Sequence, residues 1–514
     1  MAVAWKTIGE MKEMYSEAEL AFEKRKQFTG LLLGPLLFLI LILIPTPAGM
    51  TRPGQVVMAM IVWTVVWWVT EAIPIPATAF IPYIMLVVTG IMQPAQVFAV
   101  LGDSQTFLMI GAFIIVQAMI SQGLAKRFAL TALSSSWIGT SPNRLVFAFL
   151  GATALLSAVM SNIPVTMLYL AIGLGMVEFL KVRPEGNLGK TLTLASAYGA
   201  QAGGLMTPIG ATAPNFLMVG LVFSLLGYRI RFGDWMVWGV PFAIVTFLVM
   251  LIYLRLVLKP EMSELGGVVE FAKDELRRLG PMSRGEKYAL SILGVALFLW
   301  LVPSIVAAIY GQQDPTTKFF DMALNQGAVA IACALGLFLL PTNWKDRQFV
   351  MNWGEAARGV EWGVIVLISA GLLIGQAMNQ PGVDLMKYIA SGLAGPLNGA
   401  PPLLAVLGLT AIAVILTQFV SNVAAIALLV PIVVPVAIAV GANPVAVALT
   451  VGIACQQSYS LPISCPSMAV AYGGGNVKMT EMIRYGSVLS AILIPVTGIV
   501  MYLFTSVLYP YAGK

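Results

Sequence analysis

The sequence predicts an all-α polytopic membrane protein with about eleven transmembrane helices and two re-entrant hairpins. Composition is the first observation behind this class, because 59% of the 514 residues are hydrophobic and only 10% are charged. A water-soluble domain carries about 25% charged residues. The second observation is a series of apolar windows, two of which are too long for one crossing and have a polar Ser-Asn pair at their centre.

The same composition excludes several function classes. A net charge of +6 would suggest a nucleic acid partner for a soluble protein, but here the basic residues gather in short loops, where they indicate topology. We therefore expect no nucleic acid partner. The chain has no histidine, and the spacing of its three cysteines indicates neither a disulfide framework nor a metal cluster. No nucleophile and base pair or phosphate-binding loop appears, so we expect neither an enzyme nor a bound cofactor.

The order of charged and apolar segments predicts five parts. We expect a cytoplasmic amino-terminal segment over 1–29, a first transmembrane helix within 30–53, a first repeat over 54–258, a cytoplasmic linker over 259–287 and a second repeat over 288–514. The first repeat has apolar spans near 55–73, 77–92, 104–123, 191–222 and 235–257. The second has spans near 288–310, 325–341, 361–379, 443–473 and 486–509.

Each repeat also contains one apolar run that we interpret as a hairpin, over 145–180 and 402–440. A continuous helix of roughly 36 residues would be about 54 Å long, well beyond the ~30 Å hydrocarbon core. The pairs Ser161-Asn162 and Ser421-Asn422 lie at the centres of these runs. Irregular backbone at that depth is tolerated only where it is buried in protein or lines a cavity. Two such tips predict a binding site inside the membrane.

Three short matches relate the two halves in the same order. Gln-Ala-Met at 117–119 recurs at 376–378, Ser-Asn recurs 260 residues later, and Pro-Ile at 208–209 recurs at 462–463. Because each half contains five crossings, we expect the second copy to be inverted, as in many secondary transporters. Two prolines with Gly or Ser interrupt the span after each hairpin, which frees backbone groups to act as ligands.

Basic residues predict the orientation. Lys24, Arg25 and Lys26 precede the first span, and the basic stretch 259–287 returns to the same side six crossings later. Cytoplasmic loops carry an excess of Lys and Arg. We therefore expect a multi-pass protein of the cell membrane, with a cytoplasmic amino terminus and the carboxyl terminus outside.

These features resemble the divalent anion:sodium symporter family, the INDY-type dicarboxylate, citrate and sulfate transporters. Residues 67–74 read Trp-Trp-Val-Thr-Glu-Ala-Ile-Pro, which is similar to that family's long signature. The two Ser-Asn tips resemble its two Ser-Asn-Thr motifs, and 461–484 resembles its penultimate helix and following loop. The resemblance covers about residues 30 to 509, in order.

The resemblance implies a homodimer in the lipid bilayer whose transport domains move by an elevator mechanism, with Na⁺ as the coupling ion. It implies a first sodium site at Ser157, Ser161, Asn162 and Gly210, and a second at Thr417, Asn422 and Ser464. It places the following residues at a small anionic substrate: Asn162, Ile163, Thr212, Asn422, Val423, Cys465 and Pro466.

The third residue of each tip departs from the family pattern. The family has Thr in both copies to bind carboxylates, whereas this chain has Ile163 and Val423, and a further family Thr is replaced by Cys465. Each hydrogen bond to a charged group contributes roughly 1.5 to 3 kcal/mol. We expect a secondary active transporter that imports a small divalent anion, a di- or tricarboxylate or related oxyanion, with Na⁺. Alternatives are an obligate anion exchanger without net Na⁺ coupling and a sulfonate or sulfate transporter.

Overall fold

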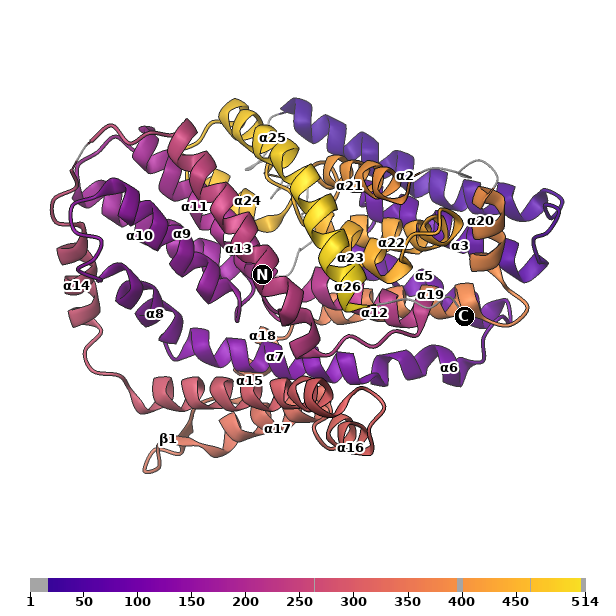
Figure 1. The fold of residues 1–514 in the computed structure, drawn as a ribbon, viewed down its shortest axis with the longest axis horizontal. Helices are drawn as coiled ribbons and strands as arrows, with labels where there is room; N and C mark the ends of the chain where they lie inside the picture. Colours follow the sequence, from indigo (N-terminus) through magenta and orange to yellow (C-terminus); the bar gives the residue numbers. More distant parts are fainter. Residues whose placement is uncertain (1–16, 263, 395–400, 463, 510–514) are drawn as a thin grey trace.

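The computed structural model describes residues 17–262, 264–394, 401–462 and 464–509 (Figure 1). Helices dominate this part of the chain, and the only sheet found there is a two-stranded ribbon. Ten helical stretches of the described residues are long and apolar enough to cross a membrane, and four shorter apolar helices accompany them. The predicted all-α polytopic class is confirmed.

The elements of the amino-terminal half are α2 (Glu17–Leu43), α3 (Arg52–Thr70), α4 (Ile75–Thr78), α5 (Phe80–Val88), α6 (Pro94–Ala99), η1 (Val100–Gly102), α7 (Ser104–Ser121), α8 (Leu124–Leu133), α9 (Pro142–Ser157), α10 (Asn162–Phe179), α11 (Asn187–Gly204), α12 (Thr212–Leu226) and α13 (Phe232–Val257). The predicted linker contains α14 (Val268–Arg278), which packs on α8.

The elements of the carboxyl-terminal half are α15 (Arg284–Tyr310), α16 (Pro315–Ala323), α17 (Gln326–Leu339), β1 (Pro341–Asn343), β2 (Gln348–Phe349), α18 (Trp353–Gly359), α19 (Trp362–Asn379), α20 (Leu385–Ala394), α21 (Pro402–Thr417), α22 (Asn422–Ala439), α23 (Pro444–Ala454), α24 (Pro466–Gly473), α25 (Met479–Val496), the π-helical turn η2 (Thr497–Met501) and α26 (Tyr502–Leu508).

Helix α2 differs from the predicted boundary at residue 29. It runs without a break from Glu17 to Leu43, so residues 17–29 continue the first apolar helix instead of forming a separate segment. The cause is local, since this stretch is rich in good helix formers and contains no proline. The remainder of the predicted segment, 1–16, lies outside the described residues.

The signature at residues 67–74 forms a corner between α3 and α4. Helix α3 ends at Thr70, and Glu71 adopts a left-handed conformation with φ of 51°. Pro74 precedes α4, and the Trp68 indole N–H donates to the carbonyl of Ile75 at 3.3 Å. Because Trp68 is fully buried, this part of the motif has a structural role.

The two predicted hairpins are interrupted at the predicted places. Helix α9 ends at Ser157 and α10 begins at Asn162, whereas α21 ends at Thr417 and α22 begins at Asn422. Four residues separate the two helices in each pair. Helices α9, α10 and α11 lie side by side in Figure 1, and α11 packs against both arms of the first pair. Helix α23 packs likewise against α21 and α22.

The spans that follow the hairpins are also interrupted. Residues 205–211, called the first break, separate α11 from α12, and residues 455–465, called the second break, separate α23 from α24. Beyond each break the chain crosses to the other half of the molecule: α12 packs against α22 and α23, and α24 packs against α10 and α11. This exchange places each break beside both repeats.

Candidate functional site

The first tip, residues 157–162, contains two polar side chains in direct contact. The Ser157 hydroxyl donates to Asn162 Oδ1 at 2.8 Å. Ser157 is fully buried, whereas Ser161 and Asn162 are partly accessible. Ser161 is the N-cap of α10 but makes no side-chain capping bond. The tip therefore presents an amide and a hydroxyl at the start of a helix, where the helix dipole is positive.

Two glycines of the opposing span lie against this tip. A Cβ on Gly204 would be 2.5 Å from Asn162 Oδ1, and a Cβ on Gly210 would be 2.7 Å from the Ser157 carbonyl oxygen. Only glycine allows such an approach. The Gly204 carbonyl accepts the N–H of Ala211 at 3.0 Å, which closes the first break on itself. The structure thus brings together three of the predicted residues, Ser157, Asn162 and Gly210, and adds Gly204.

The first break is joined to the first tip by one hydroxyl. Thr207 donates to the carbonyl of Ala158, inside the tip. Asn215, one turn into α12, donates to the carbonyls of Gly204 at 2.9 Å and Thr207 at 3.1 Å. All these groups are buried, so backbone carbonyls freed by the break are held in fixed positions.

The second tip, residues 417–422, repeats the first contact with a different hydroxyl. Thr417 Oγ1 lies 2.9 Å from Asn422 Oδ1 and 2.5 Å from the Cys455 carbonyl oxygen. The Ser458 hydroxyl lies 2.8 Å from the same Asn422 Oδ1. Four oxygens therefore converge, but a hydroxyl carries only one proton. Thr417 can satisfy one of its two neighbours at a time, which favours a cation among these oxygens.

Ser458 is a residue that the sequence reasoning missed. It lies 254 residues after Gly204, the same separation that relates the two Pro-Ile pairs at 208 and 462. Applying that separation to every residue near the first tip would have found it. Ser464, the predicted ligand, lies in the second break, is buried and donates to the Leu461 carbonyl at 2.6 Å. Its proposed role as a carbonyl ligand stays a prediction.

Gln418 joins the second tip to the second break. Its Nε2 donates to the Gln457 carbonyl at 2.8 Å, and its Oε1 accepts the backbone N–H groups of Tyr459 at 3.2 Å and Ser460 at 3.0 Å. The side chain is buried. One glutamine thus supplies the polar partners that the interrupted helix lacks.

Two glutamines connect the first and second sites. Gln201, on α11, donates to the Ser458 carbonyl at 3.2 Å and to Cys465 Sγ at 3.3 Å. Gln456 donates to Asn215 Oδ1 at 3.0 Å. Since Gln201 lies one turn before Gly204, the tips are linked through α11 and the second break. Among the described residues, no partner is found for the buried Gln201 Oε1.

The residues predicted to contact an anion differ in accessibility. Ile163 and Val423, the residues that follow the two asparagines, are partly accessible, and Pro466 is exposed. Thr212 and Cys465 are buried, and the Thr212 hydroxyl donates to the Ile209 carbonyl at 2.7 Å. The Cys465 thiol lies 3.7 Å from the Ser458 carbonyl oxygen. In this arrangement the hydroxyl and the thiol already have protein acceptors.

The donor set indicates which ions the tips can bind. Hydroxyl, amide and carbonyl oxygens suit hard cations. The described residues contain no group of three or more His, Cys, Asp or Glu side chains that could hold a metal ion. The tips therefore offer neutral oxygen ligands, a chemistry suited to a monovalent cation such as Na⁺.

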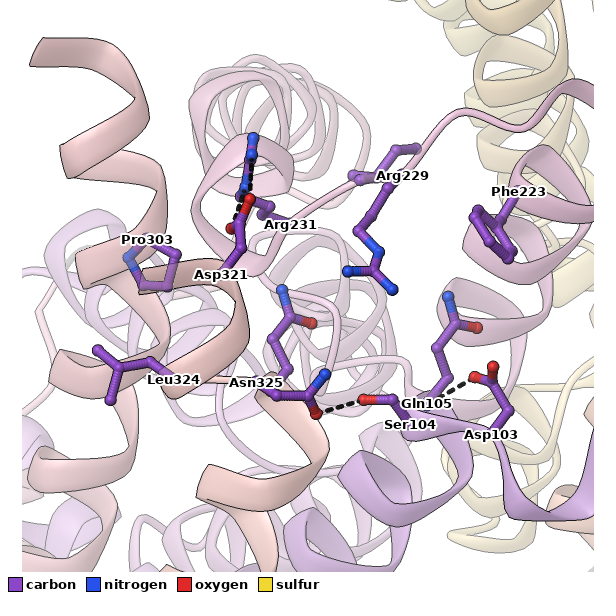
Figure 2. A pocket seen from close by; sticks show the side chains of 12 residues that line it. Asp103, Ser104, Gln105, Phe223, Arg229, Arg231, Pro303, Asp321, Leu324 and Asn325 are labelled. Carbon is purple, nitrogen blue, oxygen red and sulfur yellow. Dashed lines mark hydrogen bonds and ion pairs between the residues drawn. The ribbon is translucent and has the colours of Figure 1, made fainter. Parts of the chain in front are cut away.

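A polar cavity of about 60 Å³ lies between the linker 227–231 and the helices α7, α15, α16 and α17 (Figure 2). Its charges are largely matched: Arg231 Nε and Nη2 donate to the two oxygens of Asp321 at 2.7 and 2.6 Å. The hydrogen bond with Asp321 raises the pKa of Arg231. Ser104 donates to Asn325 at 2.6 Å. This cavity has room for about two waters and contains none of the predicted site residues, so it is the weaker candidate.

Comparisons with known proteins cover nearly the whole chain. The family model described as the sodium:sulfate symporter transmembrane region matches residues 25–510. The sodium-dependent dicarboxylate transporter SdcS of Staphylococcus saprophyticus is 32% identical over 93% of this chain and 91% of that protein. The protein of the same name from Staphylococcus aureus strain USA300 is 32% identical, with 94% of each chain covered.

Two solved structures share the fold at low sequence identity. The Neisseria gonorrhoeae MtrF structure has a TM-score of 0.56 at 14% identity and covers 92% of this chain and 97% of its own. The Alcanivorax borkumensis YdaH transporter has a TM-score of 0.51 at 15% identity, and the match covers 83% of this chain and 89% of that transporter. At these identities the likeness concerns the fold alone.

Proposed function

Because the chain belongs to the sodium:sulfate symporter family, as its resemblance predicted, we propose that it is a secondary active transporter that imports a small divalent anion with Na⁺. The two staphylococcal relatives, which are named sodium-dependent dicarboxylate transporters, support this proposal. The observation that carries it is the oxygen cluster at each tip, where a hydroxyl and an asparagine meet the backbone of an interrupted helix.

In this proposal the first Na⁺ binds at Ser157, Ser161, Asn162 and Gly210. The second binds at Thr417, Asn422 and Ser464, and we add the Ser458 hydroxyl because it contacts Asn422. Each asparagine would serve two ligands: its Oδ1 belongs to the oxygen cluster, whereas its Nδ2 can donate to an anion. A bound cation would therefore orient the amide that receives the substrate.

Electrostatics supports coupling of this kind. A dianion that enters a cell against an inside-negative potential costs about 4.6 kcal/mol per 100 mV, and two Na⁺ ions cancel that cost. Two equivalent tips offer two cation sites. The positive amino-terminal ends of α10 and α22 add a favourable potential for the anion.

The substrate is the part of the proposal that departs from the relatives. The side chains of Ile163 and Val423 cannot donate to a carboxylate, and the Cys465 thiol already faces the Ser458 carbonyl. Because these positions lack the side-chain donors that the family pattern assigns to carboxylates, a sulfonate or sulfate is a second candidate substrate class.

We further propose a homodimer in the cell membrane with a cytoplasmic amino terminus and an outward carboxyl terminus. The repeats 54–258 and 288–514 would contribute one tip each to a mobile body that moves by an elevator mechanism. The exchange of α12 and α24 between the halves supports a single body around the two tips, since neither half can move there without the other.

Uptake into proteoliposomes tests the function. Purified protein is reconstituted with a Na⁺, K⁺ or choline gradient, and uptake of radiolabelled succinate, citrate, sulfate and an alkyl sulfonate is measured. We expect saturable uptake that requires inward Na⁺. Uptake that requires internal anion but not Na⁺ would identify an exchanger, and equal flux in all gradients for every anion would refute the proposal.

A further inference from the structure

A cavity of about 370 Å³ lies between α9 and α13, and no side chain of either oxygen cluster lines it. Its lining is apolar apart from the Ser135 hydroxyl and the indole N–H of Trp137. Aromatic and branched side chains dominate, including Phe147, Leu155, Ile244 and Phe247. Leu155 is 57% exposed and Ile244 is 47% exposed. Both side chains are apolar, so in a membrane protein this opening is suited to contact with lipid hydrocarbon.

Two arginines lie near Trp137, a residue of the cavity lining, although neither arginine lines the cavity itself. The Arg144 guanidinium lies 5.5 Å from the ring centre of Trp137, which lines the cavity, and donates to the Trp137 carbonyl at 3.1 Å. Arg255 donates to the carbonyl of the neighbouring Asn143 at 2.7 Å. Among the described residues, neither arginine forms an ion pair with a carboxylate. The buried Nε of Arg255 also has no hydrogen-bond partner there.

The start of α9 adds to this positive charge. Its N-cap residue, Ser141, makes no side-chain capping bond, and the helix continues for 16 residues. Trp137 beside the arginines is 52% exposed, as is typical of tryptophans at the boundary between hydrocarbon and headgroups. Positive charge beside an apolar cavity suits a ligand that combines an anionic group with a hydrocarbon chain.

We propose that this cavity binds an anionic phospholipid, with one acyl chain between α9 and α13 and the phosphate at Arg144 and Arg255. A zwitterionic lipid offers the same chain but no net charge to the arginines. A free fatty acid has the charge but only one chain and no glycerol phosphate. Headgroup charge therefore distinguishes the proposed ligand from a zwitterionic lipid, and the glycerol phosphate distinguishes it from a fatty acid.

The position of the cavity connects the lipid to the first tip. Helix α9 forms one wall and ends at Ser157. Gly151 on that wall faces Phe247, since a Cβ on this glycine would lie 3.6 Å from the ring. Met206, in the first break, also lines the cavity. An acyl chain would therefore contact both segments that hold the first oxygen cluster, and we expect it to stabilise their packing.

Binding is tested without transport. The full-length protein is purified in detergent with equal amounts of phosphatidylglycerol and phosphatidylcholine, and bound lipid is counted by native mass spectrometry. We expect preferential retention of phosphatidylglycerol and a loss of about fivefold for each of Arg144→Gln and Arg255→Gln. Arg277→Gln, which changes an exposed arginine on α14, is the matched control and should retain the preference.

A further variant separates the contribution of the cavity from that of the two arginines. Ala148→Trp fills the cavity with both arginines intact, so we expect it to reduce binding of both lipids while the melting temperature shows that the protein is folded. Equal retention of the two lipids by the wild type, or retention unaffected by all three variants, would overturn the proposal. Displacement of phosphatidylglycerol by equimolar oleate would also overturn it in favour of a fatty acid. These outcomes are independent of the proposed transport function.

Discussion

The two tips hold their interrupted helices by opposite means. At the first tip, Thr207 in the break donates to a carbonyl of the hairpin. At the second, Gln418 in the hairpin binds three backbone groups of the break. The asparagine neighbours differ as well, because Gly204 touches Asn162 with backbone alone whereas Ser458 reaches Asn422 with a hydroxyl. Both tips therefore share a hydroxyl in contact with an asparagine, whereas the residues that surround this pair differ.

The largest effect is expected when the asparagine of either tip is removed, which tests whether the two tips are equivalent. Asn162→Ala and Asn422→Ala each delete the oxygen at the centre of a cluster and the amide available to an anion. Since each contact with a charged group contributes roughly 1.5 to 3 kcal/mol, we expect Na⁺-driven uptake to fall by about a hundredfold or more. Melting temperatures would show that folding is intact. Full uptake in one variant would mean that the tips are not equivalent.

The next test uses the difference between Gly204 and Ser458. The methyl group of Gly204→Ala would lie 2.5 Å from Asn162 Oδ1, so the asparagine must move, and we expect uptake to fall about tenfold or more. Ser458→Ala leaves space and removes one hydrogen bond, worth about 0.5 to 1.5 kcal/mol, so uptake should fall only severalfold. The two variants are compared by initial uptake rates at several Na⁺ concentrations. The reverse order would contradict the close packing at the first tip.

The hydrogen bonds that join each tip to its break should contribute differently to the stability of the protein. Gln418→Ala leaves the buried N–H groups of Tyr459 and Ser460 without their partner, at about 1 to 3 kcal/mol for each group. Thr207→Val removes one bond and keeps the shape of the side chain. We expect the larger decrease in melting temperature for Gln418→Ala. Equal decreases would indicate that the backbone of the second break finds other partners.

The smallest expected effect concerns the residues after the asparagines. Ile163→Thr combined with Val423→Thr restores a hydroxyl to each tip, which can donate to a carboxylate. We expect a severalfold shift of selectivity toward succinate, measured by competition between unlabelled anions in the uptake assay. Each single variant serves as a control for the other tip. An unaltered substrate profile would mean that this position does not face the anion.

Local sequence signals predicted the interruptions well. A Ser-Asn pair in the middle of an apolar run is unfavourable inside a continuous helix. The new helices begin at Asn162 and Asn422, so both runs are interrupted at the predicted pairs. The boundary near residue 29 is not a helix end, so it stays a prediction about where the membrane begins. The sequence around Gly30 changes from polar to apolar, but neither part contains a feature that ends a helix.

Long-range contacts were not accessible to the same reasoning. Gln201 and Ser458 are 257 residues apart, and nothing near either residue indicates the other. In the sequence Gln418 is a single polar residue beside an apolar stretch. Its role becomes visible only in the structure, where it contacts the second break. The separation of 254 residues could have pointed to Ser458, but only the contacts of Gln201 with the second break show that this glutamine connects the sites.

By itself the sequence determined the membrane class and the places at which the hairpin helices are interrupted, because both depend on local composition or on polar groups that hydrocarbon cannot solvate. Its motifs also determined the family. The tertiary structure decided which oxygens meet at each tip, through the exchange of α12 and α24 between the halves. Those contacts depend on how two surfaces pack, and packing is a property of all the side chains together.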